Sequence, residues 1–163
     1  MNLDMTDALL EVWKIHDEIN RFLIDKLPEE AFEATTLLKT GLPSKGRNVA
    51  QVFAHMHNVR RQNIGREFLA GVPHFEYADA PERDLLAAAF QASGAGIAKR
   101  LARLIETGEK KKERPGVVLL GFLIAHDSHH RALILLACKQ SGVRVPEEAK
   151  FGIWEHWVTP KLG

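Results

Sequence analysis

The 163-residue sequence has the length of one domain, and its 45% hydrophobic and 26% charged residues exclude a disordered tail, a collagen-like fibre and a disulfide scaffold. A formal net charge of +1, from 22 Lys and Arg against 21 Asp and Glu, offers no general attraction for nucleic acids or anionic membranes. The one cysteine, Cys138, allows no internal disulfide and favours a reducing cytosol.

Four stretches of the chain have helical periodicity, and none has the sustained alternation of a strand. The first runs from about Asp4, a candidate N-cap, to Lys26, and Leu27-Pro28 marks its end. A loop rich in Gly, Pro and Ser follows. The second stretch runs from about Asn48 to Leu69, just before Gly71.

The third stretch is predicted to begin near Asp79 and to end at Gly108. It contains Ser93-Gly94-Ala95-Gly96, although each glycine costs a helix about 1 kcal/mol. We therefore expect these glycines to allow close packing or a bend. The charged linker that follows, residues 109–114, is expected to be a solvated loop.

The fourth stretch begins at Pro115 and ends at Gly142. Its first half, Val117 to Ile124, is apolar on every side, which predicts burial by the bundle core or by the bundle together with a second subunit. The tail from Val143 to Gly163 carries aromatic residues that need cover, so we expect it to pack back across the bundle. These aromatic residues are Phe151, Trp154 and Trp157.

Four helices of about 20 residues or more predict an all-α four-helix bundle, formed as a single domain over residues 1–163. The spacing leaves open whether its helices alternate up and down or include a long crossover. The first ten residues contain acids where a secretion signal needs Lys or Arg, and no apolar stretch approaches the length of about 20 residues that a membrane span needs. We therefore expect a cytoplasmic protein with no membrane partner.

Five of the eight histidines fall in two short clusters, at 55–57 and 126–130. His126 and His130 are four residues apart on a helix face that is otherwise apolar, so both are expected to point inward. This spacing lets one helix present two imidazoles to one metal ion. His129 is placed toward the edge of that face.

On the second helix, His55 is in line with Val52 and Val59, whereas His57 is rotated by about 200° and is expected to point away. His55 would complete a three-histidine site with an open fourth position, the arrangement of a catalytic rather than a structural zinc. A single histidine on an apolar face is more often a hydrogen-bonded core residue. Three buried histidines that face one interior space cannot easily all find hydrogen-bond partners without a metal or water.

The other residues that could take part in a functional site are expected to have structural roles instead. His16, His74 and His156 are expected to be structural or surface residues, and Cys138 an inert core thiol. Asp127 and Arg131 adjoin the expected ligands, and the sequence favours an exposed salt-bridging pair over contacts with those ligands. The aromatic residues Trp154 and Trp157 are expected to cover the core rather than to line a pocket mouth. The chain has no Glu-x-x-His, His-Glu-x-x-His, P-loop or Gly-x-Ser-x-Gly motif.

The sequence resembles the DinB/YfiT-like superfamily of metal-dependent proteins from about Thr6 to Gly142. The resemblance is sharpest in Asn48-Val49-Ala50-Gln51-Val52-Phe53-Ala54-His55 and in His126-Asp127-Ser128-His129-His130-Arg131. One histidine in the second helix and a His-x-x-x-His pair in the fourth form the family pattern, and these fall on His55, His126 and His130. Family members often continue with Gly-Gln after the Arg, where this chain has Ala132-Leu133.

The resemblance implies an up-down-down-up four-helix bundle, commonly homodimeric, that binds a divalent metal such as zinc, nickel or iron. Characterised relatives include transferases and isomerases that use bacillithiol, mycothiol or glutathione. We therefore predict a metal-dependent enzyme, a hydrolase or a thiol transferase, in which a His₃-bound ion activates water or a low-molecular-weight thiol. Catalytic residues beyond the ligands are not assigned.

Two other functions remain to be compared. A non-catalytic bundle that binds or senses a metal or small molecule would use the same ligands, so the sequence does not separate it from the enzyme. The interpretation as a nucleic-acid-binding protein rests only on the loop from Lys110 to Arg114 and on Arg60-Arg61. The nearly neutral net charge argues against this function. Because the first half of the fourth helix is apolar on every side, we predict a homodimer.

Overall fold

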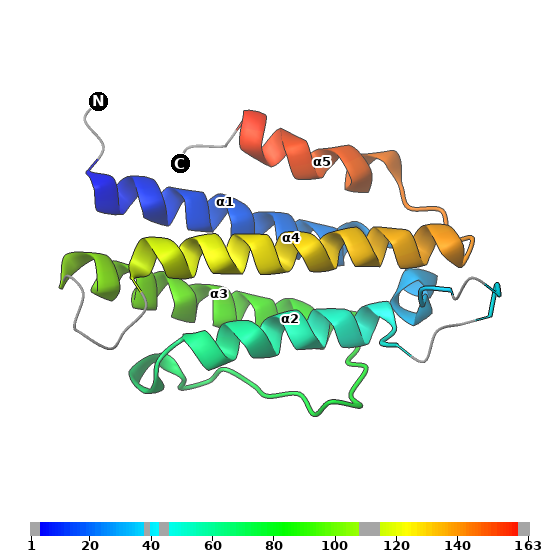
Figure 1. Ribbon diagram of the computed structural model, residues 1–163, viewed down its shortest axis with the longest axis horizontal. Coiled ribbons are helices and arrows are strands. Elements are labelled where there is room, and N and C mark those ends of the chain that lie inside the picture. Colours follow the sequence, from blue (N-terminus) through cyan, green and yellow to red (C-terminus); the bar gives the residue numbers. More distant parts are fainter. Residues whose placement is uncertain (1–3, 38–39, 43–45, 108–114, 160–163) are drawn as a thin grey trace.

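The computed structural model describes residues 4–37, 40–42, 46–107 and 115–159. These residues form five α-helices and two short 3-10 helices, and no β-strand occurs among them. The prediction of an all-α bundle is confirmed (Figure 1). The elements are α1 (Met5–Lys26), η1 (Glu29–Glu33), α2 (Val49–Asn63), η2 (Arg66–Phe68), α3 (Arg83–Glu106), α4 (Gly116–Gln140) and α5 (Glu147–Val158).

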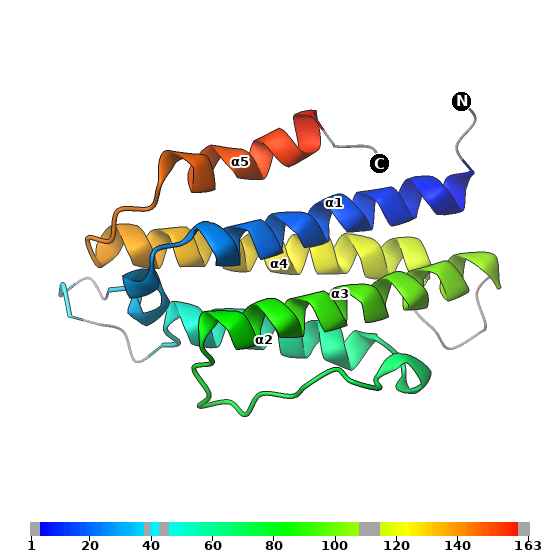
Figure 2. The same ribbon diagram turned by 180° about the vertical axis from the view of Figure 1, so that it is seen from behind.

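The first four α-helices form the bundle, and α5 lies outside it against α1 (Figure 1). Helices α1 and α4 run in one direction, while α2 and α3 run in the opposite one (Figure 2). Two parallel consecutive helices need a long connection, and residues 64–82 supply it by returning along α2 to the start of α3. This arrangement sets α2 and α4 antiparallel and in contact, with one face of each directed at the other.

Helix α2 has a well-defined start and an earlier end than the sequence predicts. The Asn48 side chain accepts a hydrogen bond from the Gln51 backbone, and the Gln51 side chain accepts one from the Asn48 backbone, which is a capping box. The expected end at Leu69 is wrong, because Gly65 adopts a φ of 92° that terminates the helix after Asn63. The short η2 turn follows.

The predicted start of the third helix is also displaced. Helix α3 begins at Arg83 rather than near Asp79. Asp79 instead closes a loop turn, because its Oδ2 accepts a hydrogen bond of 2.7 Å from the Glu76 backbone. The predicted end at Gly108 and the linker 109–114 lie outside the described residues.

The glycines of α3 allow close packing, as predicted. A Cβ atom on Gly94 would lie 2.5 Å from the Asp17 carboxylate of α1, and one on Gly96 would lie 2.8 Å from Ile64 at the end of α2. The Trp13 indole donates a hydrogen bond of 3.0 Å to the Gly94 carbonyl. These glycines therefore bring α1 and the end of α2 directly against the backbone of α3.

The buried interior has two apolar clusters with a polar layer between them. One cluster joins the C-terminal half of α1 to η1, α2 and the end of α4, and the other joins the N-terminal half of α1 to the end of α3 and the start of α4. Between them lie buried polar side chains from four helices, which are His16, Asp17, Asn20, Arg60, Ser93, Asp127 and Arg131. The core is therefore not uniformly apolar, and its polar layer lies beside the histidine site described below.

The tail packs back on the bundle as predicted, but it leaves its aromatic residues uncovered. Helix α5 contacts α1 through its small residues, and a Cβ on Gly152 would lie 2.5 Å from the Phe22 ring. Phe151 and Trp154 are on the opposite side of α5 and are 58% and 67% exposed. The prediction that these rings are covered is wrong for the single chain, because a helix that packs through small residues turns its large ones outward.

The all-round burial expected for the first half of α4 is likewise absent from the single chain. Leu119, Leu120 and Leu123 are buried, but Val117 and Val118 are 58% and 55% exposed. Phe122 and Leu136 continue this exposed apolar face at 38% and 42%. Within the described residues, each helix is too short or too polar to cross a lipid bilayer.

Candidate metal centre

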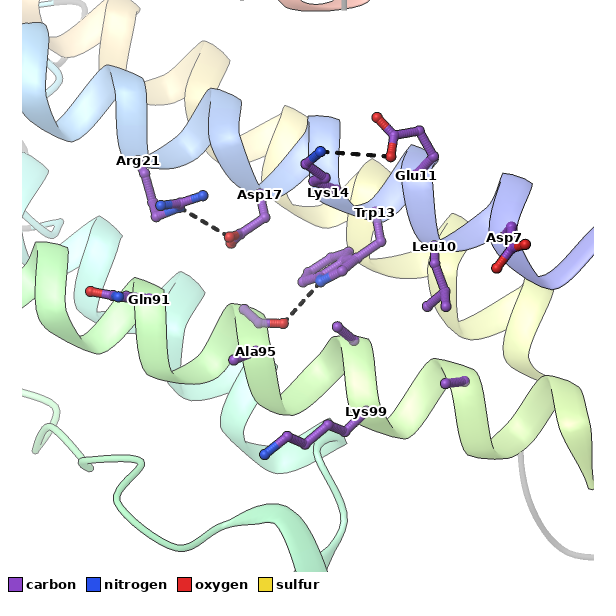
Figure 3. Close-up of a pocket in the computed structure, with 13 residues that line it drawn as sticks. Asp7, Leu10, Glu11, Trp13, Lys14, Asp17, Arg21, Gln91, Ala95 and Lys99 are labelled. Carbon is purple, nitrogen blue, oxygen red and sulfur yellow. Dashed lines mark hydrogen bonds and ion pairs between the residues drawn. The ribbon is translucent and has the colours of Figure 1, made fainter. Parts of the chain in front are cut away.

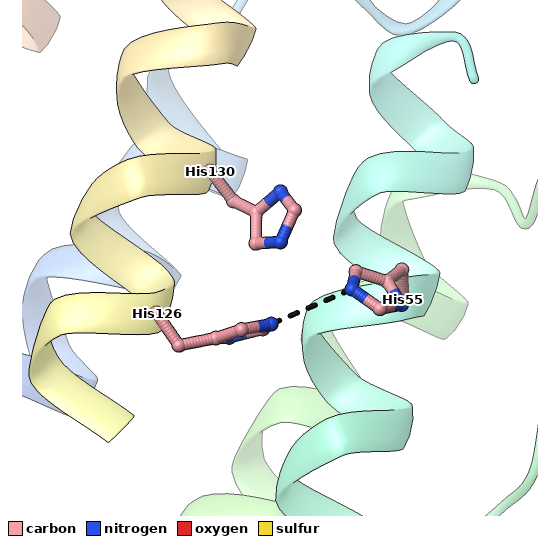
Figure 4. Close-up of side chains that lie close together, drawn as sticks. All are labelled: His55, His126 and His130. Atoms are coloured by element: carbon pink, nitrogen blue, oxygen red, sulfur yellow. Dashed lines mark hydrogen bonds between the residues drawn. The ribbon is translucent and has the colours of Figure 1, made fainter. Parts of the chain in front are cut away.

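Helices α2 and α4 bring three histidine side chains together, one from α2 and two from α4 (Figure 4). They are His55, His126 and His130, and one ring nitrogen of each lies within 4.8 Å of the other two. Within the described part of the chain, no other group of three His, Cys, Asp or Glu side chains meets this geometry. All three residues are half-buried, and together they can hold a metal ion.

The local geometry follows from helix spacing. His126 and His130 are one turn apart on α4, with ring centroids separated by 4.5 Å, and the His55 ring faces them from α2 at 5.3 and 4.8 Å. The Nε2 atoms of His126 and His55 are 3.4 Å apart. Two imidazole nitrogens bound at about 2.0–2.1 Å to a tetrahedral ion are separated by about 3.3–3.4 Å. The spacing of His55 and His126 therefore matches a tetrahedral metal, and the His130 nitrogen lies within 4.8 Å of both.

Asp127 determines which nitrogen of His126 faces the site. Its Oδ1 lies 3.1 Å from His126 Nδ1. Because an ionised carboxylate only accepts hydrogen bonds, Nδ1 carries the proton and the lone pair is on Nε2, which points at His55. A carboxylate behind a histidine is the usual support of a metal-binding imidazole. The donor set of this site therefore fits a divalent metal.

Asp127 is itself fully buried and held by residues from two other helices. Its Oδ2 accepts hydrogen bonds from Arg60 (Nη2 at 2.9 Å, Nε at 3.1 Å), His16 (Nε2 at 3.1 Å) and Asn20 (Nδ2 at 3.2 Å). Burial favours the neutral acid, but the Arg60 charge and the bonds from His126 and His16 outweigh it and hold the pKa of Asp127 well below its usual range. The carboxylate thus stays ionised behind His126.

Arg60 supplies the positive charge of this layer. The side chain is fully buried between the rings of Trp13 and Phe90, at 5.0 and 4.5 Å, and it also pairs with Asp17 Oδ1 at 2.6 Å. A buried guanidinium is tolerated only when it is fully paired, and here it has two carboxylates. Arg60 therefore links the support of the histidine site to the α1–α3 contact at Asp17.

The expected exposed pair of Asp127 and Arg131 is wrong, because both side chains are buried on the face of α4 that packs on α1. Arg131 donates to Asn20 Oδ1 and Ser128 Oγ, each at 2.8 Å, rather than to Asp127. Sequence reasoning also missed Arg60 and Asn20. The available signal was their alignment with buried apolar positions, as Arg60 follows Phe53 and Met56 at helical spacing.

The expectation that only His55 of its cluster reaches the interior is also wrong. His57 is fully buried, donates from Nε2 to the Pro73 carbonyl at 2.9 Å and packs against Phe75 and Phe90. It points away from His55, but the connection after α2 runs over that side of the helix and covers it. Burial lowers the pKa of His57.

The other histidines and the cysteine have the structural roles expected of them. His16 is buried on Asp127, His74 is an exposed loop residue, and His156 Nδ1 donates to the Gly152 carbonyl at 2.6 Å. His129 is exposed at the edge of the site. Cys138 is buried, and burial raises the pKa of its thiol to about 11, so the thiol is inert.

Two imidazoles of the site, those of His55 and His130, are held in the form that binds metals. Burial, followed by the nearby His126 and His55, lowers the pKa of His130 to about 4. Burial and then the Arg47 charge lower the pKa of His55. A metal binds the neutral imidazole, so both side chains present free lone pairs at neutral pH.

Two small cavities open beside the histidines, and a larger one lies elsewhere. One of about 190 Å³ borders His130, and one of about 280 Å³ borders His55. A groove of about 940 Å³ lies between α1 and α3 (Figure 3). Its polar groups are largely paired with one another, as Arg21 is with Asp17 at 3.1 Å and Lys14 with Glu11 at 3.9 Å. The histidine site is therefore the better candidate for chemistry.

The sequence model of the DinB family matches residues 1–157, which is nearly the whole chain. No curated protein matches the sequence.

Proposed function

The chain belongs to the DinB family, and from this premise we propose that it is a metal-dependent enzyme whose ligands are His55, His126 and His130. The metal is a divalent ion such as zinc, nickel or iron, all of which imidazole suits. Three protein nitrogens leave a coordination position for water or for a low-molecular-weight thiol. The reaction is then a hydrolysis or a thiol transfer.

The observation that carries this proposal is the contact between His126 and Asp127. A core histidine needs one hydrogen bond, and His126 already has it at Nδ1, yet its Nε2 is directed at a second imidazole 3.4 Å away. A neutral His55 can satisfy that lone pair by donating its own Nε2–H. His130 adds a third imidazole with a nitrogen within 4.8 Å of the other two, and its buried Nδ1 has no hydrogen-bond partner among the described residues. Three convergent imidazoles therefore favour a bound cation over a single hydrogen bond. When bound, a divalent ion supplies Lewis acidity that lowers the pKa of a water or thiol at its open position.

The chain's own residues contribute orientation and charge. Asp127 keeps the His126 proton on Nδ1 and fixes the ring, and Arg60, His16 and Asn20 fix Asp127. Arg131 in turn holds Asn20 through its Oδ1. This layer spans α1, α2 and α4, so the ligands from two helices are supported by a third. Such support keeps the site preorganised before a metal arrives.

The first test is the metal content of the purified protein after incubation with zinc, nickel or iron and desalting. We expect about one equivalent in the parent and almost none in His126→Ala. His129→Ala is the matched control, because this exposed neighbour on α4 should be dispensable for metal binding. A parent without metal, or a His126→Ala variant that retains it, would contradict the assignment.

The second test concerns catalysis. We expect the metal-loaded protein to turn over in a panel of hydrolysis and thiol-transfer reactions, and to lose this activity with a chelator and in His126→Ala. A protein that holds one equivalent of metal but turns over nothing in the panel would favour the alternative, a bundle that binds or senses a metal or small molecule.

A further inference from the structure

Arg47 immediately precedes Asn48, the N-cap of α2. Together with Gln51 and His55 of that helix and with residues 74–77, it lines the cavity of about 280 Å³. The lining of this cavity therefore includes both a guanidinium and an expected metal ligand.

Arg47 also borders the second cavity of the site. The pocket of about 190 Å³ beside His130 is walled mainly by apolar side chains, among them Val49, Val52 and Leu133, and Arg47 lies at its edge. One cation is thus shared by the two spaces that open next to the histidines. The first space is polar and the second is apolar.

The charge of Arg47 has no carboxylate partner among the described residues. Its guanidinium lies over the Tyr77 ring at 4.7 Å, and no ion pair joins it to an acid in that part of the chain. The carboxylate in the lining of the polar cavity, Glu76, has an 81% exposed side chain that lies 3.8 Å from His74. Arg60, by contrast, forms ion pairs with two carboxylates, those of Asp17 and Asp127.

We propose that Arg47 is an anion-binding residue of the histidine site, and that the substrate is a small organic molecule with an anionic oxygen group. The anionic group binds the guanidinium, another atom of the molecule occupies the open metal position, and an apolar part fits beside His130. This inference rests on the proposed metal site. A guanidinium suits this role because it offers a fork of donors to a carboxylate or phosphate.

The test compares two probes that differ only in charge, 3-mercaptopropionate and 3-mercaptopropionamide. Each is titrated into the cobalt(II)-loaded protein, and binding is followed through the visible absorption of the cobalt. We expect the carboxylate probe to bind at least about tenfold more tightly than the amide, the ratio typical of one charge-assisted hydrogen-bonded pair. In Arg47→Gln the two probes should bind equally.

Two further variants make the outcome specific. Arg66→Gln removes an exposed arginine beyond the other end of α2 and should keep the full preference for the carboxylate. Arg47→Lys keeps the charge but loses the fork of donors, so it should retain part of the preference, and it serves as a test if Arg47→Gln does not fold.

The failures of the two proposals are distinguishable. A parent that holds no cobalt overturns the metal site and this inference together. A parent that holds cobalt but binds both probes equally overturns the anion site alone, as does an Arg47→Gln variant with the parent's preference. Cobalt content is measured in every variant, so a change in probe binding is not mistaken for a loss of metal.

Discussion

At the scale of single residues, Asp127 is the point where the core and the site meet. One carboxylate orients the His126 imidazole through Oδ1 and neutralises the buried Arg60 through Oδ2. Neither role is available to an exposed acid, because water would compete for both oxygens. The burial that makes Asp127 costly to maintain is therefore the same feature that makes it an effective support.

We predict that Asp127→Asn weakens metal binding by about 10-fold to 100-fold, the usual effect of removing the support of a histidine ligand. An amide has one acceptor oxygen and a donor nitrogen, so it no longer enforces the His126 proton on Nδ1. Competition with a chromophoric chelator measures the change.

Asp17→Asn is the matched control for this substitution. Asp17 pairs with the same Arg60 but does not touch a histidine of the site. We expect it to lower the free energy of unfolding by about 1–3 kcal/mol, as a weakened buried pair does, and to leave metal affinity unchanged. Equal losses of metal affinity in the two variants would mean that Asp127 acts only through the fold.

At the scale of elements, the close approach of α1 and α3 depends on glycine. We predict that Gly94→Ala lowers the free energy of unfolding by about 1–3 kcal/mol, because its Cβ would displace the Asp17 carboxylate 2.5 Å away. Gly121→Ala on α4 should instead raise it by about 0.5–1 kcal/mol in the isolated monomer, since nothing in the described part of the single chain lies within 4 Å of its Cβ and alanine favours helix. Urea denaturation of both variants tests the pair.

The contrast between these two glycines is the informative result. If Gly94→Ala were neutral, the helices would have room to separate, and the close packing attributed to Gly94 would be incorrect. If Gly121→Ala were destabilising in the monomer, the open space around Gly121 in the single chain would be incorrect.

Element boundaries show which helix signals were reliable. The start of α2 was predicted correctly near Asn48, where the structure shows a local capping box, and Pro28 correctly marked the end of α1, because both features act within a few residues. The end of α2 and the start of α3 were misplaced. Apolar residues between 64 and 69 continue the helical pattern, but Gly65 in the left-handed region ends the helix first.

At the scale of the whole molecule, the apolar face of α4 is the largest departure from a self-sufficient bundle. The face consists of Val117, Val118, Phe122 and Leu136. Its large apolar side chains lie in the first third of the helix and near its end. The exposed positions between them are Gly121, Ala125, His129 and Ala132, and all of these except His129 are small. An antiparallel copy of the same helix can therefore approach closely about a two-fold axis.

We propose on this basis that the protein is a homodimer that buries this face of α4. Sedimentation velocity at micromolar concentration should give a dimer for the parent and a monomer for Val118→Lys. Leu85→Lys introduces the same charge at a 58% exposed position on α3 and should remain dimeric. A monomeric parent, or equal behaviour of the two variants, would contradict the proposal.

The sequence alone determined the helical class and the inward helix faces that carry His55, His126 and His130. These features follow from periodicity and spacing within one helix, where 3.6 residues per turn decide which side chains share a face. The tertiary structure alone decided which polar residues support the site. His16 and Arg60 reach Asp127 across 111 and 67 residues of sequence, and the connection after α2 buries His57. Such contacts depend on the relative heights at which packed helices sit, and no pattern within a single helix specifies them.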